Sequence, residues 1–190
     1  MRKTIKTALV FILMSGLLSC GQAGTYTADI NIMRNEDFYF EFVLFEEGDE
    51  STEQSGVFAR CGGWYYLRFD DNVLLHSKKE RYAIDIEQKT YWDDKTADLN
   101  FYFFDALFAS LKAVETKTNE DGTATVECKN KHKKRIVLTY KDNVLSKIDL
   151  FLYSDEFSTS CRITKFSSTI PSDIQFSIPE GYTKTDGYIR

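Results

Sequence analysis

Histidine and proline are scarce in this chain, which has two of each in 190 residues. His76 falls within a strand-like pattern and His132 within a basic turn, and neither has a cysteine or carboxylate at metal-ligand spacing. The sequence also lacks a Gly-x-Ser-x-Gly elbow, a glycine-rich phosphate loop and a His-Glu-x-x-His motif. We therefore expect no metal and no cofactor, and a protein that is not an enzyme.

An excess of basic residues is also absent. The chain has 24 Lys and Arg against 29 Asp and Glu, which gives a formal net charge of −5. Proteins that bind nucleic acid present a basic face to the phosphates, so this balance argues against a nucleic-acid partner. The cluster of Lys and Arg at residues 129–135 is interpreted as a solvated hairpin turn.

No apolar run reaches the roughly 20 residues that a membrane-spanning helix needs. The run at residues 8–18 is short and follows a basic start that includes Arg2 and Lys3. A basic start, a short apolar core and a small-residue cleavage site are typical of a removable signal peptide. We therefore expect residues 1–19 to be a signal peptide.

The cleavage site reads Leu17-Leu18-Ser19-Cys20, the pattern of a bacterial lipobox. This pattern predicts that Cys20 is acylated through its thiol and anchors the protein to a membrane; a plain secretory signal with an incidental cysteine is the alternative. Gly21, not Asp, follows Cys20, which favours the outer membrane with the protein facing the periplasm. We interpret residues 20–27 as the acylated cysteine and a tether, and residues 28–190 as a single domain.

Beyond Cys20 the number of cysteines is odd, since only Cys61, Cys128 and Cys161 remain. An odd number in an exported protein leaves at least one free thiol. Cys128 and Cys161 fall on expected strands that two others separate, and with neighbouring strands about 4.8 Å apart that separation exceeds disulfide reach. We expect all three to act as small buried side chains.

Strand signals dominate the rest of the chain. Apolar residues alternate with others at Phe38, Phe40 and Phe42, and the same period of two recurs along 55–70, 73–77 and 81–87. After residue 122 the pattern resumes at 123–130, 136–140, 147–152, 158–169 and 173–177. Short polar segments join these runs, with turns expected at 46–54, 70–72, 78–80, 131–133, 142–143 and 154–157 and a bend at Gly62-Gly63. The spacing predicts an antiparallel meander.

Residues 99–112 break the strand pattern. Phe104, Leu107, Phe108 and Leu111 stand at i, i+3, i+4 and i+7, which is a helical stripe. The stripe predicts either a core helix packed on the sheet or a lid over a cavity, and the sequence leaves both open. The expected fold class is mainly β with minor α: a strongly curved antiparallel sheet, an incomplete barrel, covered by one or two helices.

The order of these elements resembles the LolA/LolB-like family of outer-membrane lipoprotein carriers and receptors. The resemblance is carried by strand patterns at residues 56–69, 74–77 and 82–85, and by 135–182, which ends on Phe176-Ser177-Ile178-Pro179-Glu180-Gly181. Two segments depart from the family: Arg60-Cys61-Gly62-Gly63 stands where Lys-x-Pro is frequent, and Lys78-Lys79-Glu80 where Asp-Gly is usual. The carriers' cavity arginine matches no single residue here.

The resemblance implies a protein that binds acyl chains or lipidated proteins in a hydrophobic cup, with a role in lipid or lipoprotein transport. Alternate residues of a strand project to one side of the sheet. The expected wall of the cup is Phe38, Phe40, Phe42, Tyr82, Ile84, Ile86, Leu138, Ile148, Leu150 and Leu152. The alternative is a non-catalytic interaction lipoprotein whose cup is filled by its own side chains. In either case we expect a monomer.

Overall fold

The computed structural model describes residues 26–34, 36–46, 49–94, 108, 111–129, 135–151 and 158–186. Its strands form one 12-stranded sheet in the order β12-β6-β5-β4-β3-β2-β1-β11-β10-β9-β8-β7. The strands are β1 (Phe38–Glu46), β2 (Asp49–Cys61), β3 (Trp64–Phe69), β4 (Asn72–His76), β5 (Arg81–Asp85), β6 (Thr90–Asp93), β7 (Lys112–Thr118), β8 (Ala124–Lys129), β9 (Arg135–Lys141), β10 (Val144–Phe151), β11 (Ser158–Ser167) and β12 (Thr183–Lys184).

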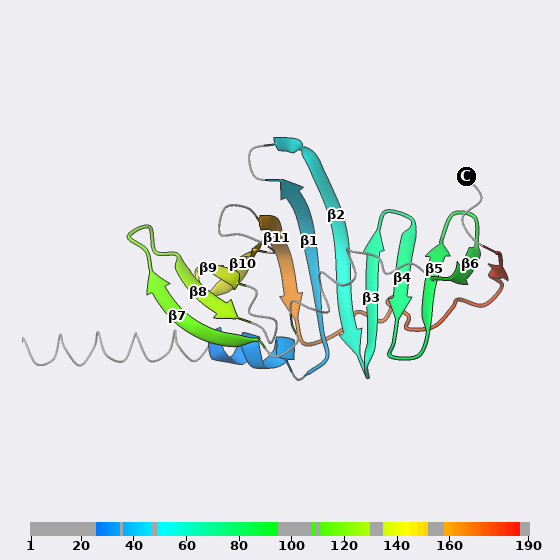
Figure 1. The fold of residues 1–190 in the computed structure, drawn as a ribbon, viewed down its shortest axis with the longest axis horizontal. Helices are drawn as coiled ribbons and strands as arrows, with labels where there is room; N and C mark the ends of the chain where they lie inside the picture. Colours follow the sequence, from blue (N-terminus) through cyan, green and yellow to red (C-terminus); the bar gives the residue numbers. More distant parts are fainter. Residues whose placement is uncertain are drawn as a thin grey trace, which may run out of the picture.

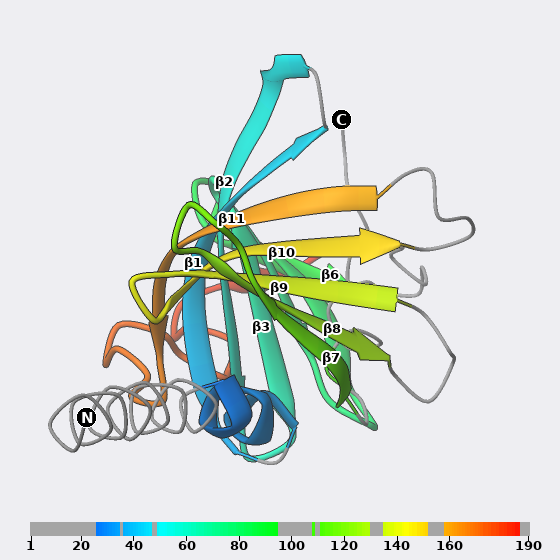
Figure 2. The same ribbon diagram turned by 90° about the vertical axis from the view of Figure 1, so that its left-hand side faces the viewer.

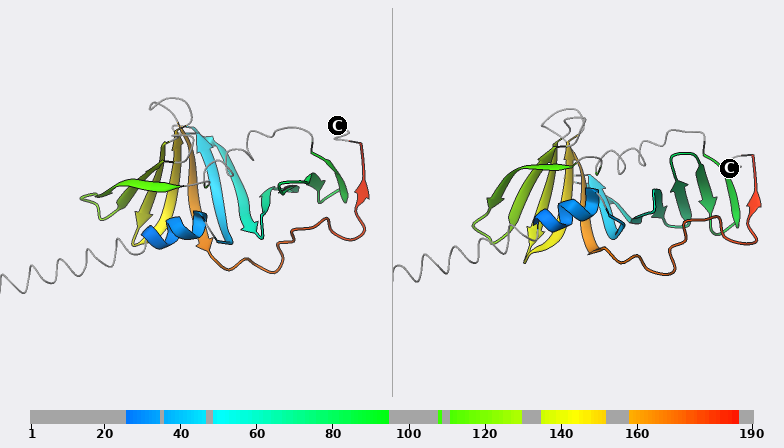
Figure 3. Two further views of the ribbon diagram at one scale, coloured as in Figure 1. Left: turned by 60° about the horizontal axis from the view of Figure 1, so that its bottom comes forward. Right: turned by 90° about the horizontal axis from the view of Figure 1, so that it is seen from below.

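The sheet is large, open, curved and almost wholly antiparallel (Figures 1 and 2). Strands β1 to β6 form one meander and β7 to β11 a second, and the pairing of β1 with β11 joins the two. β12 is the exception, because it runs parallel to β6. Residues 26–34 form a short helix against the β1 and β8–β11 part of the sheet (Figure 3). The prediction of a mainly β protein built on a curved antiparallel sheet is confirmed.

Two of the tight turns take backbone conformations that their residues favour. Gly62 and Gly63 have φ of 56° and 85°, and Asp142 and Asn143 have φ of 52° and 64°. Positive φ at both central residues is the signature of the hairpin turn that matches strand twist, and glycine and asparagine adopt it most readily. The expected bend at Gly62-Gly63 is therefore a full reversal between β2 and β3.

Several expected boundaries are wrong. The expected turn at 46–54 lies mostly within β2, and 173–177 is not a strand. Residues 112–118 form β7, which ends any helix before Lys112; within the expected helix 99–112, only residues 108, 111 and 112 are described. The domain also begins earlier than expected, because Tyr26, assigned to the tether, is helical and 5% exposed.

Apolar side chains gather in two clusters. The first, which we call the helix-side cluster, contains Tyr26, Ile30, Met33, Phe38, Phe40, Phe42, Phe58, Leu67, Phe108, Leu111, Ala124, Val126, Cys128, Ile136, Leu138, Tyr140, Leu145, Ile148, Leu150, Cys161 and Ile163. The second, the tail-side cluster, is built on Tyr39, Ala59, Tyr66, Val73, Leu75 and Ile84. Neighbours in sequence such as Tyr39 and Phe40 belong to different clusters, so the clusters lie on opposite faces of the sheet.

The chain after β11 covers the tail-side cluster. Residues 168–182 run past β2–β6 to reach β12 (Figure 1). Their apolar side chains pack on the cluster, as in the edge-on contact between Phe176 and Tyr66, whose ring centroids are 6.2 Å apart. The strand expected at 173–177 is instead part of this irregular cover. Within the described residues, no helix combines the length and hydrophobicity that crossing a membrane requires.

The lack of a side chain at Gly56 leaves room for the ring of Phe42. Gly56 pairs with Phe42, and a Cβ at Gly56 would lie 2.5 Å from Cζ of that ring. Phe42 is 1% exposed and packs between Phe40 and Phe69, with centroid distances of 5.5 and 5.6 Å, so its ring has little room to move. We expect Gly56→Ala to lower the free energy of unfolding by about 1–3 kcal/mol through overpacking.

Urea denaturation measures this loss. Ser55→Ala, at the neighbouring exposed position, is the control and should change stability by less than about 0.5 kcal/mol. Equal stabilities of Gly56→Ala and wild type would show that the Phe42 ring can shift at no cost.

Candidate functional site

The helix-side face of β1 and β2 is a wall of phenylalanine. Phe38, Phe40 and Phe42 project from β1 and Phe58 from β2, each at most 1% exposed. The Phe40 ring lies 5.5 Å from Phe42, 5.2 Å from Phe58 and 5.9 Å from Phe108. Offset and edge-on ring pairs at such distances add about 0.5–1.5 kcal/mol each beyond their burial. These rings form one continuous aromatic group within the helix-side cluster.

The wall continues across the second meander. Leu138, Ile148 and Leu150 on β9 and β10 are at most 1% exposed and belong to the same cluster. Cross-strand register explains their common face: Ile148 lies opposite Leu138 on one side and Cys161 on the other. Six of the ten residues expected to line the cup are therefore brought together, namely Phe38, Phe40, Phe42, Leu138, Ile148 and Leu150. That they contact a ligand stays a prediction.

Tyr82, Ile84 and Ile86 were expected on the same face, and that prediction is wrong. They pack with the tail-side cluster. Across the sheet Phe40 pairs with Phe58, and the row continues through Leu67 and Leu74 to Ala83. Ala83 therefore shares the face of Phe40, and its neighbours in β5 point the other way.

The remaining expected residues divide between the cluster and the undescribed part of the chain. Phe108 and Leu111, two members of the expected lid, are 1% and 0% exposed in the helix-side cluster. Phe108 lies against Phe38 with centroids 5.1 Å apart. Phe104, Leu107, Leu152 and the expected acylation site Cys20 lie outside the described residues.

Helix 26–34 covers this face and was not anticipated. Its buried apolar residues, Tyr26, Ile30 and Met33, stand at i, i+4 and i+7, a helical stripe that the sequence does contain. The stripe is easily overlooked because it lies next to the signal-like segment and spans little more than two turns. Tyr26 stacks at a tilt on Tyr140 of β9, with ring centroids 4.4 Å apart.

An arginine holds the C-terminal end of this helix. Arg60 Nη2 donates to the carbonyl oxygen of Ile32 at 3.1 Å, and Nε donates to that of Glu36 at 3.0 Å. Its guanidinium also lies 4.7 Å from the ring centroid of Phe38. Terminal helix carbonyls have no partner within the helix, and a cation at this end interacts favourably with the helix dipole. Arg60 thus joins β2 to the cover.

The middle of this helix carries a half-buried carboxyl group, that of Asp29. Burial raises the pKa of Asp29, and the nearby Tyr140 hydroxyl opposes part of that rise. The Tyr140 hydroxyl is itself buried, and no hydrogen bond of normal geometry satisfies it among the described residues. The Asp29 carboxyl and the Tyr140 hydroxyl are close enough to shift each other's pKa, so they are polar partners across the contact between the helix and β9.

The cysteines are free thiols among the described residues. Cys128 on β8 and Cys161 on β11 are 0% exposed, and β9 and β10 separate them as expected. Burial raises the pKa of the Cys128 thiol to about 12. The prediction of burial is wrong for Cys61, which is half-buried at the end of β2, where its Sγ donates to Asp37 Oδ2 at 3.4 Å.

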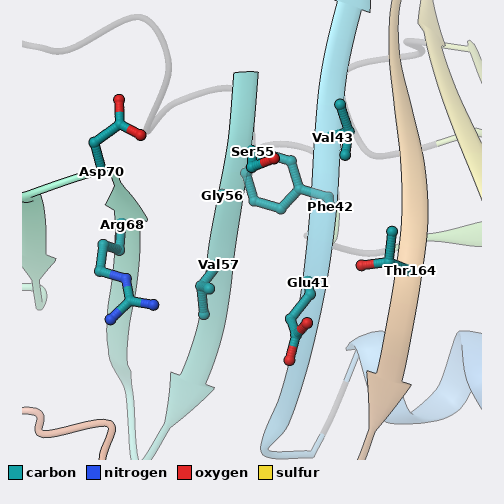
Figure 4. A pocket seen from close by; sticks show the side chains of 9 residues that line it. All are labelled: Glu41, Phe42, Val43, Ser55, Gly56, Val57, Arg68, Asp70 and Thr164. Carbon is teal, nitrogen blue, oxygen red and sulfur yellow. The ribbon is translucent and has the colours of Figure 1, made fainter. Parts of the chain in front are cut away.

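The opposite face of the sheet carries a polar groove of about 330 Å³. Figure 4 shows its arrangement: Glu41 and Val43 rise from β1, Ser55 and Val57 from β2, Arg68 from β3, Asp70 from the turn after β3, and Thr164 from β11. Glu41 accepts a hydrogen bond from the Tyr39 hydroxyl and lies 3.6 Å from Lys165 Nζ. Glu41 is thus already paired with its neighbours and the groove lies along an open surface, so it offers fewer constraints to a ligand than the helix-side face.

A buried contact between a histidine and an aspartate joins β4 to the residue that follows β6. His76 Nε2 lies 2.9 Å from Asp94 Oδ2, and the two residues are 5% and 8% exposed. A histidine oriented by a carboxylate can serve catalysis when a nucleophile adjoins it. The nearest described hydroxyl in sequence, Ser77 Oγ, is instead used in the β4–β5 turn, where it accepts from the N–H groups of Lys79 and Glu80. Within the described residues no group of three or more potential metal ligands forms.

Comparison with known proteins bears on the fold. No family model matches the sequence, and no curated protein matches it. A crystal structure of an uncharacterized conserved protein from Thermus thermophilus aligns with a TM-score of 0.51 at 8% identity, over 87% of this chain and 99% of that one. At that identity the likeness concerns the fold alone, so this chain shares a large curved antiparallel sheet with a protein whose function its description leaves open.

Proposed function

We propose that this protein is a non-catalytic lipid-binding lipoprotein of the cell envelope, related in architecture to the LolA/LolB-like carriers and receptors, and that it takes acyl chains on its helix-side face. One observation carries the proposal. A continuous apolar wall spans β1–β3 and β8–β11, and its cover is a helix of about two turns that Arg60 holds at one end. A wall with a detachable cover is what a reversible carrier of acyl chains needs.

The helix and an acyl chain are held to the wall by free energies of similar size. Full burial of an apolar side chain contributes about 1.5–3 kcal/mol, so Tyr26, Ile30 and Met33 together hold the helix with roughly 5–9 kcal/mol. An acyl chain of about 15 methylenes gains roughly 12 kcal/mol at about 0.8 kcal/mol each. The hydrogen bonds of Arg60 add about 1.5–3 kcal/mol each to the helix, so the two totals are of similar size and a long acyl chain can compete with the helix for the wall.

The position of the cover suits an anchored protein. Cys20, the expected acylation site, shortly precedes Tyr26, the first described residue of the helix. A fully extended chain spans about 3.3–3.6 Å per residue, so at most about 20 Å separates the two. The cover would then face the membrane surface from which acyl chains come.

A second candidate follows from the packing of the same face. Phe40, Phe58 and Leu67 are 0% exposed and already in contact with their own chain. This observation favours a non-catalytic interaction lipoprotein in which the cluster is the permanent core and the outer surface meets a partner. The two candidates differ in whether the helix can leave.

A variant that weakens the attachment of the helix distinguishes the two candidate functions. Arg60→Gln removes the positive charge and at least one of the two hydrogen bonds to the carbonyl oxygens of Ile32 and Glu36, a loss of about 1.5–3 kcal/mol. Because displacing the helix then costs less free energy, we expect a fluorescent fatty-acid probe to bind Arg60→Gln about 10–100-fold more tightly than wild type. Titration of the purified chain with the probe measures this.

Arg162→Gln is the matched control, because Arg162 is exposed and paired with Glu53 on the surface of the sheet. Its affinity for the probe should equal that of wild type. Failure of the probe to bind either wild type or Arg60→Gln would refute acyl-chain binding and leave the interaction lipoprotein. If both arginine variants bound the probe more tightly by the same factor, the attachment of the helix would not explain the effect.

A further inference from the structure

β7 ends the sheet with an exposed edge. All seven of its residues, Lys112–Thr118, are exposed, and Val114 is one of two exposed large hydrophobic residues in the described chain, at 57%. β7 pairs with β8 on one side, and no described strand pairs with it on the other. Figure 1 shows it at the opposite end of the sheet from β12. Such an edge presents unpaired backbone groups to any strand that can approach.

The turn that joins β7 to β8 shows which backbone groups face outward. Asn119 N–H donates to the carbonyl oxygen of Thr123 at 2.8 Å, so these two residues form a hydrogen-bonded pair. Hydrogen-bonded and non-hydrogen-bonded pairs alternate along an antiparallel ladder. Lys117 opposite Thr125 is therefore hydrogen-bonded, whereas Thr116 and Thr118 direct their N–H and C=O groups away from β8.

Cross-strand charges on β7 are poorly matched within the chain. Glu115 stands opposite Glu127 on β8, and Lys112 stands opposite Lys129. Like charges directly opposite each other destabilise a sheet. Glu115 is relieved by Lys117 of its own strand, whose Nζ lies 3.2 Å from Glu115 Oε1, and both side chains are at least half exposed. The outer side of Glu115 is open to a further cation.

We propose that β7 pairs antiparallel with β7 of a second copy of this chain, with Thr116 on the two-fold axis. An identical strand can pair symmetrically about any residue of β7, but a register about Val114 would be centred on the bulge between Ala113 and Glu115; Glu115, Thr116 and Lys117 are the centres in the regular part of the strand. The registers about Glu115 and Lys117 place like charges on the axis. The register about Thr116 sets Glu115 of each copy opposite Lys117 of the other, and Val114 opposite Thr118. It also uses the outward-facing N–H and C=O of Thr116 in a hydrogen-bonded central pair.

The same charges explain why an identical copy is selected. Lysines on an edge, and a bulge such as the one between Ala113 and Glu115, protect edge strands from indiscriminate pairing. A strand of unrelated sequence meets Lys117 and Glu115 without matching acids and bases. An identical copy in the Thr116 register supplies both, so repulsion of other partners and attraction of this one come from one pattern. The resulting dimer replaces the monomer expected from the sequence.

Disulfide cross-linking of cysteine variants identifies the register of the proposed β7–β7 pairing. The variants are made in the full chain with Cys20 and Cys61 replaced by Ser, since Cys128 and Cys161 are fully buried. Directly opposite residues have Cα atoms about 4.5–5.5 Å apart, within disulfide reach, whereas residues two positions out of register exceed about 7 Å. Under mild oxidation Thr116→Cys should form a covalent dimer. Glu115→Cys and Lys117→Cys should each fail alone and cross-link when mixed.

Charge reversal then tests what selects the partner. In the Thr116→Cys background, Lys117→Glu opposes glutamates across the axis, and the dimer yield should fall at least about fivefold. Adding Glu115→Lys restores the opposite-charge pairs and should restore the yield. All these positions are exposed, so circular dichroism should be unchanged. The proposal is overturned if the mixture does not cross-link, if Glu115→Cys or Lys117→Cys cross-links alone as well as Thr116→Cys, or if both charge variants match the parent.

Discussion

Replacing Phe40 with Ala should lower the free energy of unfolding by about 3–5 kcal/mol. Phe40 is 0% exposed and touches the rings of Phe38, Phe42, Phe58 and Phe108. Truncation removes the transfer free energy of the ring and leaves a cavity that neighbours on separate strands cannot close together. Small domains are stable by only about 5–15 kcal/mol, so this single change removes a large share of the total.

Phe45→Ala on the same strand is the matched control. Phe45 is half-buried and lies beneath Lys147 and Arg162, whose cationic groups are 5.9 and 5.7 Å from its ring centroid. The same chemical truncation there opens no closed cavity, and the loss should stay near 1 kcal/mol. Urea denaturation curves with unchanged slopes give both values. If the two variants lose equal stability, the phenylalanine wall is not the centre of the core.

The parts of the fold that could be predicted from sequence rest on local chemistry. Alternation at Phe38, Phe40 and Phe42 places these rings on one face of a strand, whatever its neighbours are. Gly62-Gly63 and Asp142-Asn143 mark tight turns because their residues tolerate positive φ. These signals act within a few residues, so they survive without knowledge of the tertiary structure.

Relations between distant strands could not be predicted, because they depend on register. Tyr82 and Ile84 alternate as clearly as the residues of β1, but which face they occupy depends on the pairings that link Phe40 to Ala83 through three intervening strands. A change of one residue in any hairpin would move them to the other face. The sequence therefore identifies strands that have one apolar face. It does not show which of these strands place their apolar faces on the same side of the sheet.

Elements without an amphipathic pattern were missed for a different reason. β7 has no apolar alternation, because both of its faces are exposed and no core selects its residues. Residues 170–176 carry apolar side chains at Ile170, Ile174 and Phe176, which resemble a strand but cover the tail-side cluster as an irregular segment. In both places the backbone conformation is set by position relative to the sheet, which local propensity does not contain.

Replacing Leu150 with Glu should cost more than about 3 kcal/mol at neutral pH. Leu150 is 1% exposed, between Ile136 on β9 and Thr159 on β11, in a cluster of buried apolar side chains. An ionised carboxylate there has lost its water and gained no partner, a loss of about 3–5 kcal/mol in comparable sites. Val144→Glu, at the 63% exposed start of the same strand, is the matched control and should change stability by less than about 0.5 kcal/mol.

Lowering the pH should restore much of the stability that Leu150→Glu loses. The direction of this change follows from the linkage between proton binding and folding. Burial raises the pKa of a carboxyl group above its unfolded value of about 4.3, so the folded variant binds more protons than the unfolded chain between the two pKa values. Its stability therefore falls as the pH rises through that window, and the charge penalty is absent below it. The remaining loss at low pH is that of a neutral carboxyl group in an apolar site. Every other titrating group is common to Val144→Glu, so the difference between the two variants, measured by urea denaturation at pH 7 and pH 4, isolates position 150. A difference that is the same at both pH values would show that water reaches the introduced carboxylate, and that the helix-side face is open there.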